Sequence, residues 1–239
     1  MFDIAERHKI LKEKIMKTNI FRNSLIAALT IAMAFIFINC SGNKGIASNP
    51  TGVPGSPEAA NGKTLANLLE AYNGESNANA KYLKYAEKAD SEGYGKVASL
   101  FRAAAFAEGI HMKNHAKVIE QMGGVPKSEI KIPEIKSTEE NLKAAIEGET
   151  YERDTMYADF MAEARRTGNK DALRTFNFAR EAEGEHAKMY KDALVNLDKW
   201  KGEKTTFYVC PTCGYTTANP DLEKCPVDFT PKEQFAEIN

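Results

Sequence analysis

The sequence predicts an all-α fold, a four-helix bundle followed by a small cysteine-containing domain. Between residues 64 and 199, glycine and proline fall mainly at the joints of four long segments that favour helix. A Glu-x-x-His pattern occurs in the second and fourth segments, and a Gly-Glu pair occurs in the segment before each of them. Behind the helices, three of the four cysteines lie within sixteen residues, which favours a metal site over disulfides.

The charge balance bears on the class of partner. The 239 residues include 32 basic and 33 acidic side chains, and the formal net charge is −1. Proteins that bind nucleic acid usually carry a basic patch or a strong excess of lysine and arginine. We therefore expect no nucleic-acid partner.

The N-terminal segment predicts an export signal. Residues 25–38 form an apolar run that is shorter than the ~20 residues of a membrane span and suits the hydrophobic region of a signal peptide. Cys40 follows this run, as in bacterial lipoprotein signals, in which this cysteine is lipidated, although Asn39 stands where a small residue is usual. We expect residues 1–40 to be a lipoprotein signal, and we expect the lipidated protein to stay tethered at the cell envelope. An uncleaved membrane anchor and a buried helix are the alternatives.

Residues 41–61 are rich in glycine, serine, asparagine and proline and lack apolar periodicity, so we predict a flexible linker. The bundle then occupies residues 62–202, and the C-terminal domain occupies residues 203–239.

The four helices have recognisable ends. Ser137 and Glu140 form a capping box at the start of the third helix, and Gly168 is a typical stop at its end. The segment before Ser137 is too long for a tight turn and suits the long crossover connection of ferritin-like bundles. We predict helices at residues 64–91, 95–122, 137–167 and 170–200.

The repeated pattern predicts a site for two metal ions. In each Glu-x-x-His the two side chains lie on one helix face, because residues three apart are neighbours on a helix. The first and third helices add single carboxylates, 33 and 34 residues before the glutamates of the two patterns. A single pattern would more simply place its glutamate on a solvated face, but a repeat with matched flanks favours iron, which accepts carboxylate and imidazole together. The candidate ligands are Glu75, Glu108, His111, Glu149, Glu183 and His186.

The two halves differ at one carboxylate. Alignment of the halves places Glu152 opposite Ala78, so the second half holds a glutamate that the first half lacks. A fifth glutamate near one iron could exchange with a histidine as the redox state changes. We therefore include Glu152 among the candidate metal ligands and expect it to act in catalysis.

Two tyrosines and one further histidine lie near the ligands in the sequence. Tyr82 and Tyr157 follow the single glutamates of their helices by seven and eight residues, about two turns. They could donate hydrogen bonds to carboxylates that bind metal, and ordinary aromatic packing is the alternative. His115 lies one turn beyond His111, and we expect it on the surface or at a partner contact.

The C-terminal cysteines predict a second metal site. Cys210-Pro-Thr-Cys213-Gly is one half of a rubredoxin-type or zinc-ribbon knuckle, and Cys225-Pro-Val-Asp228 stands where the other half is expected. Three thiolates and the Asp228 carboxylate could bind iron or zinc tetrahedrally. An empty segment that serves as a structural cap is the alternative.

The order of these motifs resembles the rubrerythrin family over residues 64–235. The resemblance implies a non-haem di-iron peroxidase that reduces hydrogen peroxide to water, with a rubredoxin-like centre relaying electrons. It also implies a homodimer in which the small domain of one chain approaches the bundle of the other. By motif, Glu152 matches the family's glutamate that exchanges with histidine, and Tyr82 and Tyr157 match its tyrosines beside the ligands.

We therefore expect an exported, membrane-tethered di-iron peroxidase that protects the cell envelope. The electron donor stays unknown, because Asp228 alters the relay centre and export separates the protein from cytoplasmic reductases. A ferroxidase or iron-handling role and a non-catalytic scaffold are the alternatives. Buried carboxylates without metal would be costly, which argues against the scaffold.

Overall fold

The computed structural model describes residues 57–239, with side chains from residue 62 onward. The predicted signal segment, the lipidation site Cys40 and most of the predicted linker lie outside the described residues. Within the described part of the chain, no helix is both long and apolar enough to cross a membrane.

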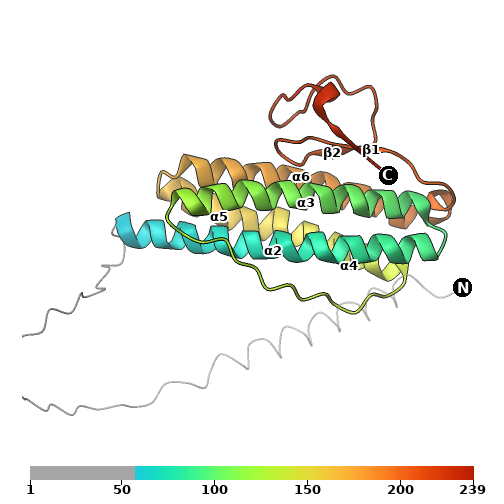
Figure 1. The fold of residues 1–239 in the computed structure, drawn as a ribbon, viewed down its shortest axis with the longest axis horizontal. Coiled ribbons are helices and arrows are strands. Elements are labelled where there is room, and N and C mark those ends of the chain that lie inside the picture. The colour runs from blue at the N-terminus through green and yellow to red at the C-terminus, as the bar shows by residue number, and fades with distance from the viewer. Residues whose placement is uncertain (1–56) are drawn as a thin grey trace, which may run out of the picture. The chain divides into compact units, whose positions relative to one another are not determined.

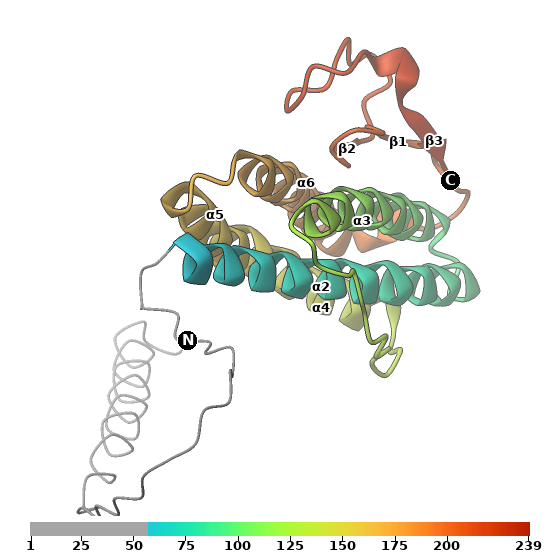
Figure 2. The same cartoon turned by 60° about the vertical axis from the view of Figure 1, so that its left-hand side comes forward.

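Four helical columns pack side by side, as the sequence predicts (Figure 1). The first two columns are unbroken helices, and the crossover connection then runs back along the bundle to the start of the third column (Figures 1 and 2). The third predicted helix is divided by a π-helical turn, η1. The elements are α2 (Pro57–Ser91), α3 (Gly95–Gln121), α4 (Thr138–Tyr151), η1 (Glu152–Met156), α5 (Tyr157–Arg166) and α6 (Lys170–Val195).

The π-helical turn explains a one-residue mismatch between the halves. A π turn holds one residue more than an α turn, and such turns often mark functional sites. The spacing from Glu149 to Tyr157 is therefore one residue longer than that from Glu75 to Tyr82. With this extra residue, both tyrosines return to the bundle core.

Local signals set the helix ends. The Ser137 side chain accepts a hydrogen bond from the backbone of Glu140, and the Glu140 side chain accepts one from the Ser137 backbone, so the predicted capping box is present. Asn169 caps α6 through the backbone of Ala172. Gly168 follows α5 with φ +68°, a conformation that glycine adopts without steric cost.

Two aromatic clusters fill the bundle core. The first holds Tyr82, Phe101 and Tyr190, with ring centroids 5.1–5.8 Å apart. The second groups Tyr157 and Phe176 around the imidazole of His115. A run of fully buried alanines on α3 lets the neighbouring helices approach closely between these clusters.

The C-terminal domain is a small three-stranded sheet whose first strand packs on α3 (Figure 2). Its strands run antiparallel in the order β2-β1-β3. The ring of Trp200 stacks on that of Phe207, at 6.3 Å and 18°, where the bundle leads into this domain. The elements are η2 (Leu197–Trp200), β1 (Phe207–Val209), β2 (Thr216–Thr217), η3 (Lys232–Gln234) and β3 (Ala236–Ile238).

Candidate metal centre

Six of the seven predicted di-iron ligands meet inside the bundle, each at most 1% exposed. Their donor atoms fall into two groups of four, and within each group the atoms lie within 4.8 Å of one another. Both groups contain Glu108 and Glu183, so these two carboxylates can bridge two metal positions. The groups are Glu75, Glu108, His111 and Glu183, and Glu108, Glu149, Glu183 and His186.

The hydrogen bonds of the four glutamates leave a matched set of free oxygens. In each glutamate, one carboxylate oxygen contacts a tyrosine or histidine, and the other is buried without a hydrogen-bond partner. Four such oxygens, one from each helical column, would be very unfavourable in a dry protein interior. Two divalent cations would satisfy them, so the donor set fits a pair of metal ions. The unpartnered atoms are Glu75 Oε2, Glu108 Oε1, Glu149 Oε2 and Glu183 Oε1.

Each histidine turns its Nδ1 atom toward the carboxylates. His111 Nδ1 lies 2.8 Å from Glu108 Oε2, and His186 Nδ1 lies 2.9 Å from Glu183 Oε2. The opposite ring nitrogens donate to the C-terminal domain, His111 Nε2 to the carbonyl of Cys213 and His186 Nε2 to the hydroxyl of Thr216, both at 3.1 Å. A proton held on Nε2 leaves Nδ1 free to bind metal, as is usual for ligating histidines.

The two tyrosines contact the single glutamates of the site. Tyr82 donates to Glu149 Oε1 at 2.7 Å, and Tyr157 donates to Glu75 Oε1. Both rings also belong to the aromatic clusters, so packing and hydrogen bonding occur together. Each hydroxyl therefore orients one carboxylate from α2 or α4.

Burial and mutual repulsion govern the charges of the metal-free site. Burial, followed by the charge of Glu183, raises the pKa of Glu149 from 4.5 to about 7. Burial would lower the pKa of His111, but Glu183 and Glu108 outweigh it and raise that pKa well above its ordinary value. In the metal-free site, bound protons therefore neutralise part of the negative charge that metal cations would otherwise balance.

The fifth predicted glutamate lies apart from both ligand groups. Glu152 is partly exposed, and its Oε1 lies 4.0 Å from the position of a Cβ atom on Gly74. Burial of the carboxyl and the charges of Glu75 and Glu149 raise the pKa of Glu152 well above its ordinary value. His111, not Glu152, therefore completes the first group of donors.

The prediction for His115 was wrong. Its side chain is fully buried on α3, with Nε2 3.1 Å from the hydroxyl of Tyr157 and Nδ1 3.0 Å from the hydroxyl of Thr175. Burial lowers the pKa of His115, which keeps the ring neutral. The signal in the sequence that could have indicated burial was the position of His115 one turn beyond His111, on the same helix face. Thr175 was not identified from the sequence.

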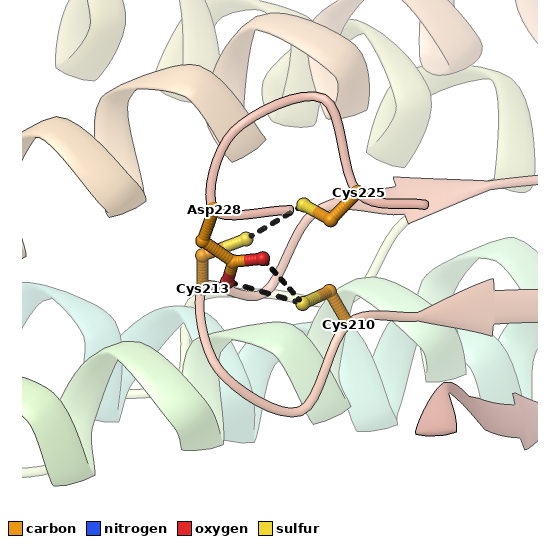
Figure 3. Close-up of side chains that lie close together, drawn as sticks. All are labelled: Cys210, Cys213, Cys225 and Asp228. Atoms are coloured by element: carbon orange, nitrogen blue, oxygen red, sulfur yellow. Dashed lines mark hydrogen bonds between the residues drawn. The ribbon is translucent and has the colours of Figure 1, made fainter. Parts of the chain in front are cut away.

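In the C-terminal domain the four predicted ligands point toward one another (Figure 3). The Sγ atoms of Cys213 and Cys225 are 3.4 Å apart, and Cys210 Sγ lies 3.3 Å from Asp228 Oδ2. The donor atoms of all four residues lie within 4.8 Å of one another. This compact arrangement of three sulfurs and one carboxylate fits a tetrahedral metal ion.

Two similar turns place these ligands, the first at residues 210–214 and the second at residues 225–229. The backbone N–H of Gly214 donates to Cys210 O, and that of Phe229 donates to Cys225 O, both at 3.0 Å. Gly214 and Phe229 both have positive φ, +81° and +65°. Asp228 Oδ1 accepts from the backbone two residues ahead, as Cys213 Sγ does in the first turn. Asp228 therefore occupies the position of a fourth cysteine.

The first turn rests directly on the bundle of its own chain. The side chain of Asn114 donates to Thr212 O at 2.9 Å, next to the bond from His111 to Cys213 O. A Cβ atom on Gly214 would lie 2.3 Å from His111 Nε2, so only glycine fits at this contact. The metal site of the C-terminal domain is thus joined to a di-iron ligand through one residue and one hydrogen bond.

Comparisons with known proteins agree with this geometry. Residues 66–194 match the family model described as Rubrerythrin. Nigerythrin of Nitratidesulfovibrio vulgaris is 40% identical over 175 residues, 73% of this chain and 86% of the relative. Rubrerythrin-2 of Clostridium acetobutylicum is 38% identical over 178 residues, 73% of this chain and 96% of the relative.

Among solved structures, fully reduced, all-ferrous nigerythrin superposes with a TM-score of 0.69 at 33% identity, covering 87% of this chain and all of that one. A Desulfovibrio desulfuricans bacterioferritin, at 22% identity and a TM-score of 0.58, shares the fold. The predicted fold class is confirmed. Together with the ligand groups, the comparisons also confirm the predicted di-iron centre and C-terminal metal site. The chain belongs to the rubrerythrin family.

Proposed function

We propose that this protein is a di-iron peroxidase that reduces hydrogen peroxide to water. The observation that carries the proposal is the pair of ligand groups sharing Glu108 and Glu183, with four buried carboxylate oxygens open toward them. These two groups would hold two irons, which would supply the two electrons that one peroxide molecule takes up. Membership of the rubrerythrin family supports peroxidase chemistry at this site.

The bound irons would supply the electrons and the Lewis acidity of the reaction. The protein's own residues hold the site in place and keep it dry. Tyr82 and Tyr157 fix the orientation of the single carboxylates, and the C-terminal domain fixes the ring of His111 through its Nε2 proton. The charges of Glu75 and Glu149 act on the carboxyl of Glu152, and we propose that this carboxyl replaces His111 as a ligand on oxidation after a change of its side-chain conformation.

We further propose that the C-terminal site passes electrons to the di-iron centre. The short connection from Cys213 through its carbonyl to His111 supports this role. Iron is the metal that the role requires, and the Asp228 carboxylate would change the reduction potential relative to four thiolates. The donor that reduces this site is a separate protein or small molecule of unidentified class.

Location and assembly are also proposals. The apolar run of residues 25–38, followed by Cys40, supports export and attachment to the cell envelope through a lipid. We propose a homodimer, as the family resemblance implies. Within one chain, the C-terminal domain already contacts its own His111 and His186.

Stopped-flow oxidation of the reduced, iron-loaded protein separates the candidate functions. We expect hydrogen peroxide to oxidise the di-iron centre much faster than dioxygen at equal concentration. Comparable or faster oxidation by dioxygen would instead favour a ferroxidase or iron-handling role. If neither oxidant reacts with the centre, the non-catalytic scaffold role would be favoured.

A further inference from the structure

A line of four hydrogen-bonding side chains leads from a surface cavity to the metal centre. Thr175 on α6 contacts His115 on α3, His115 contacts Tyr157 on α5, and Tyr157 contacts Glu75 on α2. All four side chains are buried, with Thr175 the most exposed at 5%. Neither Thr175 nor His115 belongs to a ligand group.

The outer end of the line reaches a cavity of about 270 Å³. Thr175 is one of its lining residues, beside Asn114 on α3 and Thr212 of the C-terminal domain. The charged side chains of Lys117, Asp171 and Arg174 also line it. A cavity of this size and polarity holds water, so Thr175 stands between solvent and the buried histidine.

The contacts allow one consistent direction of donation. Tyr157 gives its hydroxyl proton to Glu75, so its oxygen must accept from His115 Nε2. A neutral His115 protonated at Nε2 has an acceptor at Nδ1, and Thr175 is the donor at that atom. Each proton in the line therefore points toward the carboxylate of Glu75.

We propose that Thr175, His115 and Tyr157 conduct protons from the water of this cavity to Glu75 at the di-iron centre. In one transfer, Tyr157 passes its proton to Glu75 Oε1 and receives the Nε2 proton of His115. His115 then receives the Thr175 proton at Nδ1, and cavity water restores the threonine hydroxyl. Thr175, His115 and Tyr157 are neutral before and after the transfer, whereas the Glu75 carboxylate is neutralised by the proton that it gains, which the cavity water takes from solvent. Rotation of the hydroxyls with a tautomer change of His115 resets the line.

The chemistry of the site requires a supply of protons. This inference rests on the proposed function, in which one hydrogen peroxide, two protons and two electrons give two waters. The bound irons would provide the electrons, and the protons must enter a core whose ligands are at most 1% exposed. Tyr82, the other tyrosine of the site, contacts Glu149 without a histidine behind it, so the two halves differ in this respect.

The matched variants Thr175→Val and Thr64→Val test the proposal. Valine keeps the shape of threonine and removes its hydroxyl, and Thr64 is a fully buried threonine whose hydroxyl contacts Thr167 and lies outside the line. Stopped-flow oxidation of the reduced, iron-loaded full chain by hydrogen peroxide would be measured in H₂O and D₂O. We expect Thr175→Val to slow oxidation about tenfold or more, with a larger solvent isotope effect and unchanged iron content. Thr64→Val should behave as the unmodified protein, and equal rates for the two variants would overturn the proposal.

A second readout is independent of peroxidase activity. In Zn²⁺-loaded protein, ¹⁵N NMR of the imidazole should show His115 protonated at Nε2, with Nδ1 accepting a hydrogen bond. Exchange of the Nε2 proton with water should slow in Thr175→Val and not in Thr64→Val. An Nδ1-protonated ring, or equal exchange in the two variants, would refute the line of donation. If the unmodified protein fails to react with peroxide, the proposed function fails, and this measurement alone decides on the conduit.

Discussion

Replacement of Gly214 by alanine tests the contact between the C-terminal domain and the di-iron site. The new Cβ atom would lie 2.3 Å from His111 Nε2, whereas ordinary contacts begin at 3.4 Å, so the turn must move by about 1 Å. His111 cannot yield, because its ring is buried and its other nitrogen faces the carboxylates. The displacement breaks the 3.1 Å hydrogen bond from His111 to Cys213 O.

The expected loss of folding stability in Gly214→Ala has two parts. A non-glycine residue at positive φ costs roughly 1–2 kcal/mol, and the lost hydrogen bond adds about 1 kcal/mol. Gly168→Ala is the matched control, because Gly168 also has positive φ, +68°, and nothing lies within 4 Å of its Cβ position. We therefore expect the control to lose roughly 1–2 kcal/mol and Gly214→Ala to lose about 1 kcal/mol more.

Urea denaturation of the iron-loaded proteins would measure these losses. Trp200, the single tryptophan, is a suitable reporter because it stacks on Phe207 where the two domains join. Hydrogen exchange should also show reduced protection near Cys213 in Gly214→Ala alone. Equal stability and equal protection in the two variants would refute the close contact between Gly214 and His111.

Three further predictions concern the metal sites. Glu152→Ala should retain its iron, because Glu152 lies outside both ligand groups, and should reduce peroxide more slowly; unchanged turnover would exclude the ligand exchange. Metal-free protein should become less stable to urea as pH rises from about 5 to 7. The raised pKa of Glu149 favours the protonated folded state, and this contribution, at most about 3 kcal/mol, disappears above about 7. The raised pKa values of His111 and His186 have the same sign, but their contribution is lost only as pH rises above 6.5, the ordinary histidine value; a flat profile from pH 5 upward would contradict the assigned charges. Asp228→Cys should strengthen the thiolate-to-iron absorption of the C-terminal site and shift its reduction potential; an unchanged spectrum would show that Asp228 is not near the metal.

The sequence was sufficient to predict six clustered ligands because helical periodicity is a local property. Glu108 and His111 share a face through their spacing alone, and the repeat supplies the second pair. The capping box at Ser137 was equally readable, since both of its hydrogen bonds lie within one turn. The position of Asp228 followed from the framework of the second turn.

Other features depend on contacts between distant segments. The π-helical turn left only a one-residue difference in spacing, which by itself does not specify a turn type. His115 was expected at the surface because its partners Tyr157 and Thr175 lie 42 and 60 residues away on other helices. The fit of Gly214 against His111 likewise arises from packing between domains that no local pattern encodes.

Mössbauer spectroscopy of the ⁵⁷Fe-loaded protein tests the central claim most directly. If Glu108 and Glu183 bridge two irons, the oxidised protein should show a pair of ferric ions coupled antiferromagnetically to a diamagnetic ground state, distinct from the iron of the C-terminal site. Glu108→Ala should abolish the coupled pair, because Glu108 belongs to both ligand groups. Iron bound only as isolated ferric ions, or a coupled pair that persists in Glu108→Ala, would contradict the account.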